Sequence, residues 1–408
     1  MKNYILLSAF LLSTTTIFGQ QNQVESDSTK TQTLEEVLVQ SVRVKPNAPI
    51  THSNLTKAQL QSRNLGQDLP ILLNYLPSVV TTSDAGAGIG YTGIRVRGVS
   101  PLSTNVTING IPFTDAESLG AFWVNMPDFT SSVESLQLQR GVGTSTNGSG
   151  AFGASVNILT DASSYIPTAE VSNSFGSYNT RKHSVKFSTG KINDVFELSG
   201  RLSTINSDGY VDRAFSDLKS YFLQGTYNNN GTLIKALVFG GHEKTYQSWE
   251  GLTKQQLEDD RRQNPYTYEN EIDNYKQDHY QLHWNQKLNQ NWSTNLGLNY
   301  TYGRGYYEQY RENDAVSTYG GIVEATGVDF YGTAVTDLIR RRWLDNDFYV
   351  INATANYKES DLNLIVGGSY SNYDGDHFGE VIWARQFASE TSIRDQYYFG
   401  NGKKTDFS

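Results

Sequence analysis

The feature that most constrains this chain is a series of segments in which apolar and polar residues alternate. The clearest segment is WSTNLGLNYTYG, from Trp292 to Gly303. Successive side chains of a strand point to opposite faces, so the tryptophan, leucines and tyrosines share one face and most small polar residues share the other. A soluble β-sandwich also alternates, but its polar face meets bulk water and favours charge. The uncharged polar face here favours a transmembrane β-barrel strand between lipid and lumen.

Other segments repeat the pattern less cleanly, and the joins between them differ in length. These segments are VFELSGRLSTIN, SYFLQGTYNN, HYQLHWNQKL, FYVINATANY and LNLIVGGSYSNY. Tight turns are expected at 228–231, 289–291 and 358–361, whereas 245–275 and 305–343 are long, polar and aromatic. Short turns at one end and long loops at the other are typical of outer-membrane barrels. We therefore predict about ten antiparallel transmembrane β-barrel strands over residues 161–408.

The N-terminal region predicts export. The apolar segment ILLSAFLL follows a lysine and precedes small and polar residues, which indicates a signal peptide over residues 1–20. Residues 21–32 are polar and aperiodic, so we expect them to be disordered. The next segment, TLEEVLVQSVRV (Thr33 to Val44), favours an extended conformation. It can add as an edge strand to a partner's sheet, or it can be the first strand of the following domain.

Residues 45–160 have the pattern of one compact α+β unit. Leucines at helical spacing predict a helix over Leu60 to Leu76, which Pro77 ends. Short strands separated by turn residues follow, namely SVVTT, IRVRG, NVTING, VESLQLQRG and ASVNILTD. The glycine-rich stretches 86–93 and 141–153 lack the strand–loop–helix context of phosphate loops. Within IRVRG, alternation predicts that Arg95 and Arg97 lie on one strand face.

Composition excludes several classes of function. The chain has no cysteine, so it has no disulfide framework, no thiolate metal site and no cysteine nucleophile. Its net charge of -9 argues against nucleic-acid binding. His279 and His283 are the only histidines close in sequence. On a strand they would lie about 13 Å apart at ~3.3 Å per residue, too far to share one metal ion. We therefore expect no enzyme, no cofactor and no metal centre.

Several motifs carry a resemblance to a known family. In order, LEEVLVQSVRV, LPSVVT, IRVRGVS, NVTINGIPFTDAES and VESLQLQRGVGTSTNGSGAFGASVNILT are similar to those of TonB-dependent outer-membrane receptors. FWVNMPDF and RRRWLDNDFY resemble the versions common in Bacteroidetes. The resemblance implies a plug domain near 45–160 inside a 22-stranded outer-membrane barrel, of which this chain would be the N-terminal part. It also implies the TonB periplasmic domain as partner, with outer-membrane lipid around the barrel.

The resemblance also implies energy-coupled uptake of a scarce ligand. We expect a small-molecule metal chelate, with a ferric siderophore first. Cobalamin, haem or peptide import and a non-transport role as surface receptor or adhesin stay open. The segment that TonB grips, the TonB box, would comprise Leu34, Glu35, Glu36, Val37, Leu38, Val39, Gln40, Ser41 and Val42.

Two further sets of site residues follow. Arg97 before Gly98 and Arg140 before Gly141 match two plug arginines that pair in the family with barrel-wall glutamates, and Arg95 is predicted to share the face of Arg97. Glu197 and Glu243 are the candidate glutamates; alternatively the arginines only solvate an edge strand. Ligand contacts are expected from plug residues and from barrel loops, although ordinary loop packing explains these aromatic residues as well. They are Tyr91, Phe113, Phe122 and Trp123 on the plug, and Tyr246, Trp249, Tyr306, Tyr307 and Tyr310 on the loops.

Overall fold

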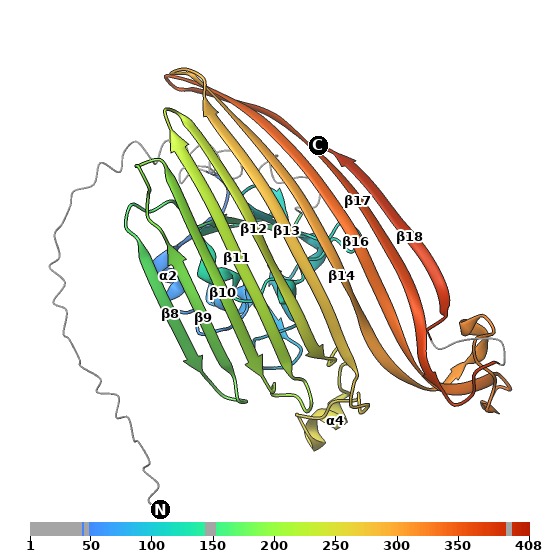
Figure 1. Cartoon of the computed structure of the whole chain (residues 1–408). Helices are drawn as coiled ribbons and strands as arrows, with labels where there is room; N and C mark the ends of the chain where they lie inside the picture. Colours follow the sequence, from blue (N-terminus) through green and yellow to red (C-terminus); the bar gives the residue numbers. More distant parts are fainter. Residues whose placement is uncertain (1–42, 45–48, 143–151, 389–393) are drawn as a thin grey trace, which may run out of the picture.

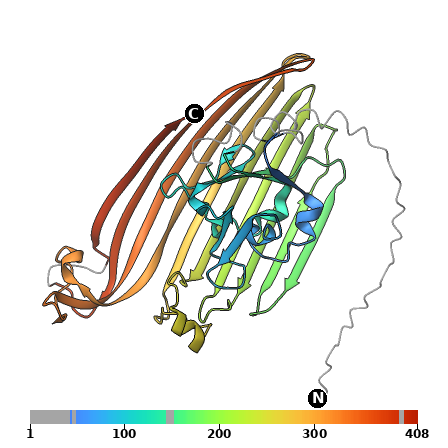
Figure 2. The same cartoon turned by 180° about the vertical axis from the view of Figure 1, so that it is seen from behind.

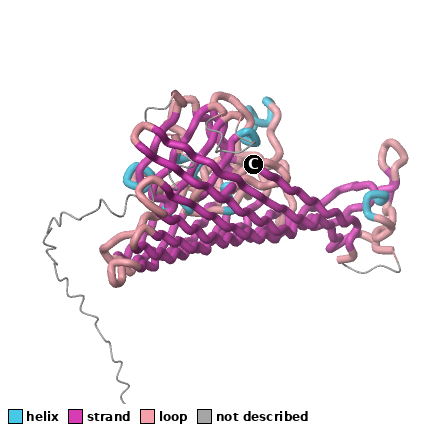
Figure 3. The backbone as a smooth tube through the Cα atoms, turned by 90° about the horizontal axis from the view of Figure 1, so that it is seen from above, coloured by secondary structure: helices cyan, strands magenta, loops and turns pink. Residues whose placement is uncertain are grey.

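The computed structural model describes residues 43–44, 49–142, 152–388 and 394–408. They form two parts, a small mixed unit and a large antiparallel sheet (Figures 1 and 2). We call the small unit the plug and the large sheet the wall. The plug lies against one side of the wall, as the view from above shows (Figure 3). None of the helices in the described residues is long and apolar enough to cross a membrane.

The main path of the wall contains ten strands, and each strand pairs antiparallel with the next one in the sheet. Its order is β8-β9-β10-β11-β12-β13-β14-β16-β17-β18, and the short β15 pairs with β16 beside this path. The strands are β8 (Thr168–Phe175), β9 (Arg181–Ser188), β10 (Phe196–Ser207), β11 (Ser216–Asn229), β12 (Thr232–Tyr246), β13 (Ile272–Lys287), β14 (Trp292–Ala315), β15 (Gly327–Val328), β16 (Ala334–Glu359), β17 (Leu362–Ala384) and β18 (Gln396–Phe407).

The predicted alternation is present along β14. Trp292 is 41% exposed on the face away from the plug, whereas Asn295 and Asn299 are buried on the other face. Cross-strand partners continue each face, because directly opposed residues point the same way. Leu298, for example, lies between Leu282 of β13 and Ile351 of β16. Along this part of β13, β14 and β16, the outer face is therefore apolar and aromatic, and the inner face is mainly polar and small.

The joins alternate in length, as predicted. Residues 230–231, 288–291 and 360–361 make short turns at one end of the wall. The other end carries the long joins 247–271, with the helix α4 (Lys254–Asp259), and 316–333, with the 3-10 helix η5 (Val316–Tyr319). We call this the long-loop end; it is the lower end of the wall in Figure 1.

One loop prediction was too long. Most of 305–343 is strand, because β14 continues to Ala315 and β16 begins at Ala334. The polar sequence hid this extension. Its charges are paired across the two strands, as Arg341 Nε is 2.8 Å from Glu308 Oε2. A strand that projects past the apolar band no longer needs an apolar face, so its alternation disappears.

The plug has a five-stranded sheet in the order β1-β6-β7-β4-β5, in which only β4 and β7 are parallel. A separate pair joins β2 to β3. The strands are β1 (His52–Thr56), β2 (Val79–Ser83), β3 (Thr92–Val96), β4 (Thr104–Ile108), β5 (Ile111–Pro112), β6 (Val133–Arg140) and β7 (Ala154–Thr160). Three 3-10 helices complete it, η1 (Pro101–Ser103), η2 (Trp123–Asn125) and η3 (Phe129–Ser132).

The predicted helix Leu60 to Leu76 is wrong in extent. Two short helices stand there instead, α2 (Lys57–Gln61) and α3 (Leu69–Leu72). Gly66 separates them with φ +124, a conformation that a helix cannot contain. Leu65 beside it is 61% exposed and contributes nothing to the core. The leucine spacing therefore reports burial on one side of an irregular segment.

Plug and wall share one hydrophobic core. Phe129 of η3 packs on Phe222 and Phe239 of the wall, with ring centroids 6.2 Å and 5.1 Å away. Beside this contact, Gly241 of β12 lets η2 come close. A Cβ at Gly241 would overlap the Asn125 carbonyl oxygen and would lie 2.7 Å from Pro127 Cδ. The absence of a side chain at Gly241 on the inner face therefore determines how closely the plug can approach the wall.

Candidate ligand-binding site

A cavity of about 540 Å³ lies between the plug and the wall, toward the long-loop end. The plug contributes side chains from the β2–β3 hairpin and from the segment between β5 and the end of η2. The wall contributes side chains from β12, β13, β14, β16, β17 and β18 and from the join after β12, so neither part forms the cavity alone. The lining residues are Tyr91, Phe113, Asp115, Glu117, Ser118, Phe122, Asn125, Glu243, Trp249, Asp273, Tyr275, Gln277, Gly305, Tyr306, Tyr307, Arg342, Trp343, Leu344, His377 and Tyr398.

Aromatic rings form a connected group on one side of this cavity. The ring of Tyr91 meets that of Trp249 edge-on at 5.3 Å, and Trp249 meets Tyr307 at 5.7 Å. The Tyr91 hydroxyl donates a hydrogen bond to Asp273 Oδ2. Burial, together with the carboxylates of Glu243 and Asp273, raises the pKa of Tyr91 well above its usual value, so the hydroxyl keeps its proton. Tyr91 therefore ties the plug to the wall at the cavity edge.

The charged lining is predominantly acidic. Asp115, Glu117, Glu243 and Asp273 contribute carboxylates. His377 Nε2 lies 2.7 Å from Glu117 Oε2, and Arg342 is held by the Tyr398 hydroxyl at 3.3 Å.

Two of these carboxylates are buried without a cationic partner. Glu243 is 1% exposed and Asp273 is 8% exposed. Among the described residues, no basic side chain forms an ion pair with either one; their hydrogen bonds come from hydroxyl groups such as those of Thr245 and Tyr91. Burial without a counter-charge disfavours the charged form of these carboxyl groups, and a cationic group in the cavity would stabilise that form.

Six of the nine aromatic residues predicted as ligand contacts line this cavity, and three do not. Trp123 is 3% exposed in the shared core. Tyr246 donates to the Tyr268 carbonyl oxygen at 2.6 Å, and Tyr310 donates to Asp337 Oδ2 at 3.0 Å. Tyr306, Tyr307 and Tyr310 belong to strand β14 instead of a loop. Contact with a ligand stays a prediction for the lining residues.

Sequence reasoning missed much of the lining. The lining includes Asp115 and Glu117, which lie in the motif NVTINGIPFTDAES. These acidic residues follow Phe113 closely, and that arrangement could have marked them as candidates. His377 and Tyr398 lie on β17 and β18, and nothing in their sequence surroundings indicates that these strands reach the plug.

The predicted plug arginines have a different geometry from the one expected. Strand β3 ends at Val96, and Arg97 has φ +54, so Arg97 does not share the strand face of Arg95. The physical reason is the turn at Arg97–Gly98, where both residues adopt positive φ. Arg95 and Arg97 are both exposed.

Arg140 is buried but has neutral partners. Its Nε donates to the Pro77 carbonyl oxygen at 3.0 Å and its Nη2 donates to Ser53 Oγ at 2.9 Å. Burial, and secondarily the charge of Arg97, lower its pKa. Over the described parts of the chain, no ion pair joins Arg95, Arg97 or Arg140 to an acidic residue.

The two candidate glutamates have other surroundings. Glu197 accepts hydrogen bonds from Ser188 Oγ and from the Ser164 backbone N–H, at 2.5 Å and 3.0 Å. Glu243 lines the cavity instead. The plug–barrel arginine lock therefore stays a prediction.

Plug and wall are joined by ion pairs in which the plug side is acidic and the wall side is basic, the reverse of the predicted arrangement. Asp128 of the plug lies 2.5 Å from Lys182 Nζ of β9 and 3.1 Å from Arg201 Nη1 of β10, and all three side chains are almost completely buried. Ser131 and Ser203 also donate to this carboxylate. Burial would raise the pKa of Asp128, but Arg201 and Lys182 outweigh it and hold the pKa at about 2.

Asp161 makes a second contact of this kind. Its carboxylate lies 2.6 Å from Lys186 Nζ of β9 and 2.6 Å from Lys57 Nζ of the plug. Its backbone carbonyl accepts from Lys235 of β12 at 3.1 Å. These wall cations were not predicted, although a lysine or arginine on the mainly small, polar face of a strand was a usable signal.

The predicted TonB box, Leu34 to Val42, lies outside the described residues. The two residues that follow it are bound along the plug sheet. Arg43 Nη2 donates to the backbone carbonyl oxygens of Ser135 and Asn157, both at 2.8 Å. Val44 exchanges two hydrogen bonds with the Gln137 side chain. A displacement of the chain at residue 43 would thus reach β6 and β7 directly.

Comparisons with known proteins agree with this architecture. Residues 45–155 match the TonB-dependent Receptor Plug Domain. The chain is 25% identical over 224 residues to a probable TonB-dependent siderophore receptor, PirA, of Acinetobacter baumannii, an alignment that covers 52% of this chain and 28% of that protein.

Solved structures show the same fold. The ferric-catecholate import receptor Fiu of E. coli K12 is similar with a TM-score of 0.64 at 12% identity, covering 88% of this chain and 56% of that one. BauA, the ferric preacinetobactin receptor of Acinetobacter baumannii, is similar with a TM-score of 0.62 at 12% identity, with the same coverage of 88% and 56%. This chain thus spans about half the length of these structures.

The chain combines a plug domain with the antiparallel strands that follow it. Residues 45–155 match the plug of the TonB-dependent receptors, and the described fold is similar to that of solved receptors of this family. The members of this family are outer-membrane β-barrel proteins that act as transporters and receptors.

Proposed function

We propose that the protein containing this chain takes up a scarce ligand across the outer membrane with energy delivered by TonB, and that the ligand is a ferric siderophore. The observation that carries this proposal is the cavity built jointly by plug and wall. A ligand that touches Tyr91 and Trp249 together contacts the movable part and the fixed part at once. Binding there can change the position of the plug, and thereby the presentation of the TonB box.

The mechanism involves no chemistry on the ligand. TonB grips Leu34 to Val42 and pulls, and the load passes through Arg43 and Val44 to β6 and β7. Asp128 and Asp161 resist, because their partners Lys182 and Lys186 belong to the wall. Opening therefore needs the part of the plug nearest the N-terminus to move while these contacts keep the remainder in place.

The choice of a siderophore rests on similarity. PirA is named as a siderophore receptor, and Fiu and BauA are named as receptors for ferric chelates. The partners would be the TonB periplasmic domain, outer-membrane lipid and a small-molecule metal chelate, with no role for nucleic acid.

Growth under iron limitation tests the proposal. Cells that lack the gene should fail to use at least one ferric siderophore that parent cells use. In cells that make the protein without Leu34 to Val42, uptake of that chelate should stop while binding at the cell surface persists. A deletion of equal length in the polar stretch, residues 22–30, is the control and should transport normally. Unchanged uptake without the box would rule out the TonB assignment, and growth of the gene-deleted cells on every siderophore would rule out the ligand class.

A further inference from the structure

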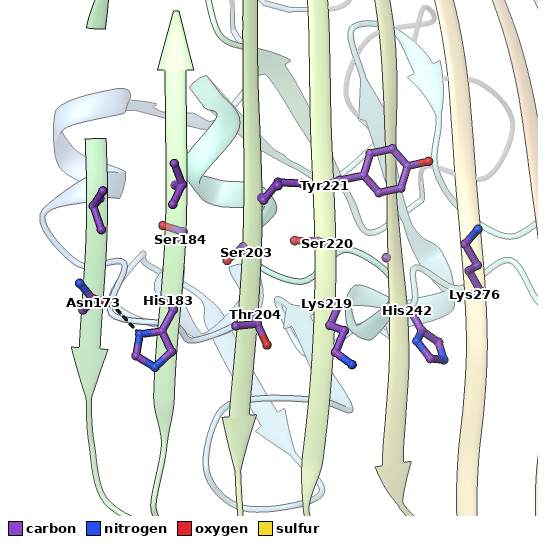
Figure 4. Close-up of a pocket in the computed structure, with 14 residues that line it drawn as sticks. Asn173, His183, Ser184, Ser203, Thr204, Lys219, Ser220, Tyr221, His242 and Lys276 are labelled. Carbon is purple, nitrogen blue, oxygen red and sulfur yellow. Dashed lines mark hydrogen bonds between the residues drawn. The ribbon is translucent and has the colours of Figure 1, made fainter. Parts of the chain in front are cut away.

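The outer face of the wall carries a shallow hollow of about 730 Å³ across β8 to β13 (Figure 4). One row of cross-strand partners runs through it, with one residue from each of six adjacent strands. The row is Asn173, His183, Thr204, Lys219, His242 and Lys276. Directly opposed residues share a face, so these side chains form a continuous polar line on the side away from the plug.

The adjoining row toward the short turns is mainly apolar. It contains Val171, Val185, Leu202 and Tyr221, and Val171 and Leu202 are 70% and 67% exposed. The hollow is lined by both rows. It therefore has an apolar part and a polar edge, the distribution of polarity found along a lipid molecule.

The polar line also lies at the correct height for lipid head groups. The line continues from Lys276 to Arg304, which lies opposite it on β14. Strand β14 begins at Trp292, in the aromatic row near the short turns. The strand between them rises about 40 Å at ~3.3 Å per residue. A tilt of about 40° reduces this to ~30 Å, the thickness of the hydrocarbon core. The line thus marks the membrane surface at the long-loop end.

Charge distinguishes this line from an ordinary polar border. Lys219 is exposed, and no hydrogen bond or ion pair engages its ammonium group within the described residues. Among the residues that the structure describes, the ring nitrogens of His183 and His242 bond only to the side-chain oxygens of Asn173 and Asn274, at 2.6 Å and 2.8 Å. Lys276 alone has an acidic partner, Asp278 Oδ2 at 2.8 Å. The row holds four basic side chains over β8 to β13 and no acidic one.

We propose that this hollow binds a phosphate-bearing lipid of the membrane leaflet next to the long loops. The phosphate lies beside Lys219 and His242, and acyl chains lie over Val185 and Leu202. A phosphate group offers several acceptor oxygens and negative charge to the ammonium and imidazole groups, and basic clusters at the membrane surface recognise lipid head groups in this way. This site is independent of ligand uptake, because it faces away from the plug.

The proposal is tested by measuring lipid binding to the whole protein after it has been purified from cells and freed of bound lipid. The probes are a phosphorylated lipid A, the same lipid without phosphate, and inorganic phosphate alone. We expect the phosphorylated lipid to remain bound in native mass spectra and to raise the melting temperature, with much weaker effects of the other two. The variant Lys219→Gln with His242→Gln leaves every ion pair of the wall intact and should weaken binding at least tenfold.

The matched control removes the same kind of charge at the opposite end of the wall. Lys287→Gln with Lys358→Gln should bind the phosphorylated lipid like the parent. Equal binding by the parent and the Lys219/His242 variant would overturn the proposal. So would equal binding of the lipid without phosphate, because apolar contact alone would then explain it. A full effect of inorganic phosphate would overturn the lipid assignment.

Discussion

Lys182 of the wall and Asp128 of the plug form an ion pair with 2.5 Å between Nζ and Oδ1, and both side chains are buried. Arg201 approaches the same carboxylate from the neighbouring strand. A buried pair of this kind adds little net stability, because removing two charges from water offsets their attraction. The ion pair instead fixes where the plug lies on the wall. Any movement of the plug would leave three charged groups without their partners.

The first prediction concerns this contact. Asp128→Asn should loosen the plug while the wall stays folded, because Lys182 and Arg201 would remain buried without a counter-charge. Loss of one partner from a buried pair costs about 3–5 kcal/mol. Limited proteolysis of the purified protein should show faster cleavage within the plug, and cells should admit a large antibiotic that the parent excludes.

Two comparisons sharpen this test. Glu170→Gln removes a carboxylate that is exposed on β8, and it should leave proteolysis unchanged. Arg97→Ala with Arg140→Ala should have a smaller effect than Asp128→Asn, because Arg140 binds a carbonyl and a hydroxyl group instead of a carboxylate. A larger effect of the double arginine variant would show that the arginines form the main lock after all.

Acid should release the plug for the same reason. The pKa of Asp128 is about 2, below its ordinary value of 3.8. A depressed pKa contributes stability that is complete above the ordinary value and is lost as the pH falls toward the folded value. The contribution is about 2 kcal/mol at 1.36 kcal/mol per unit, and Asp161, whose pKa is also lowered, adds to it.

Cleavage by an acid protease measures this effect. Plug cleavage of the parent should rise between about pH 4 and about pH 2. The Asp128→Asn variant should already be sensitive at the upper end and should change less over this range. A parent that shows the same cleavage at both ends would contradict the role given to these carboxylates.

The sequence predicted the parts of this fold that depend on one repeated local rule. Alternation in Trp292 to Gly303 needs only the two-residue period of a strand and the difference between lipid and lumen. Asp128 shows the opposite case. Its importance depends on Lys182 and Arg201, which are 54 and 73 residues away and reach it only because β9 and β10 pass behind η3. The same holds for Glu243 and Asp273, whose cavity needs the plug to be placed against the wall.

A third prediction uses the close approach at Gly241. Gly241→Val should push η2 away from β12, because the new side chain would overlap backbone atoms of Asn125 that cannot turn aside. We expect plug cleavage to increase while heat-modifiable migration of the wall persists. Gly225→Val is the matched control, since the nearest atom to a Cβ there is Phe196 Cε2 at 4.0 Å. Equal behaviour of the two variants would mean that the plug adjusts freely to the wall.

The last prediction concerns the charge of the ligand. Glu243 and Asp273 are buried at the cavity and have no basic partner in the described part of the chain, so the cavity should favour a ligand with a protonated amine. An iron chelate of three hydroxamates with a free amine should bind more tightly than the same chelate after acetylation of that amine. Removal of one charge-assisted contact is worth roughly 1.5–3 kcal/mol, about tenfold or more in affinity. Glu243→Gln with Asp273→Asn should abolish the difference, while the affinity for the acetylated chelate should change little. Tryptophan fluorescence of the purified protein measures both affinities, because Trp249 and Trp343 line the cavity. If the acetylated chelate binds as tightly as the amine to the parent, then the two carboxylates are not part of ligand recognition.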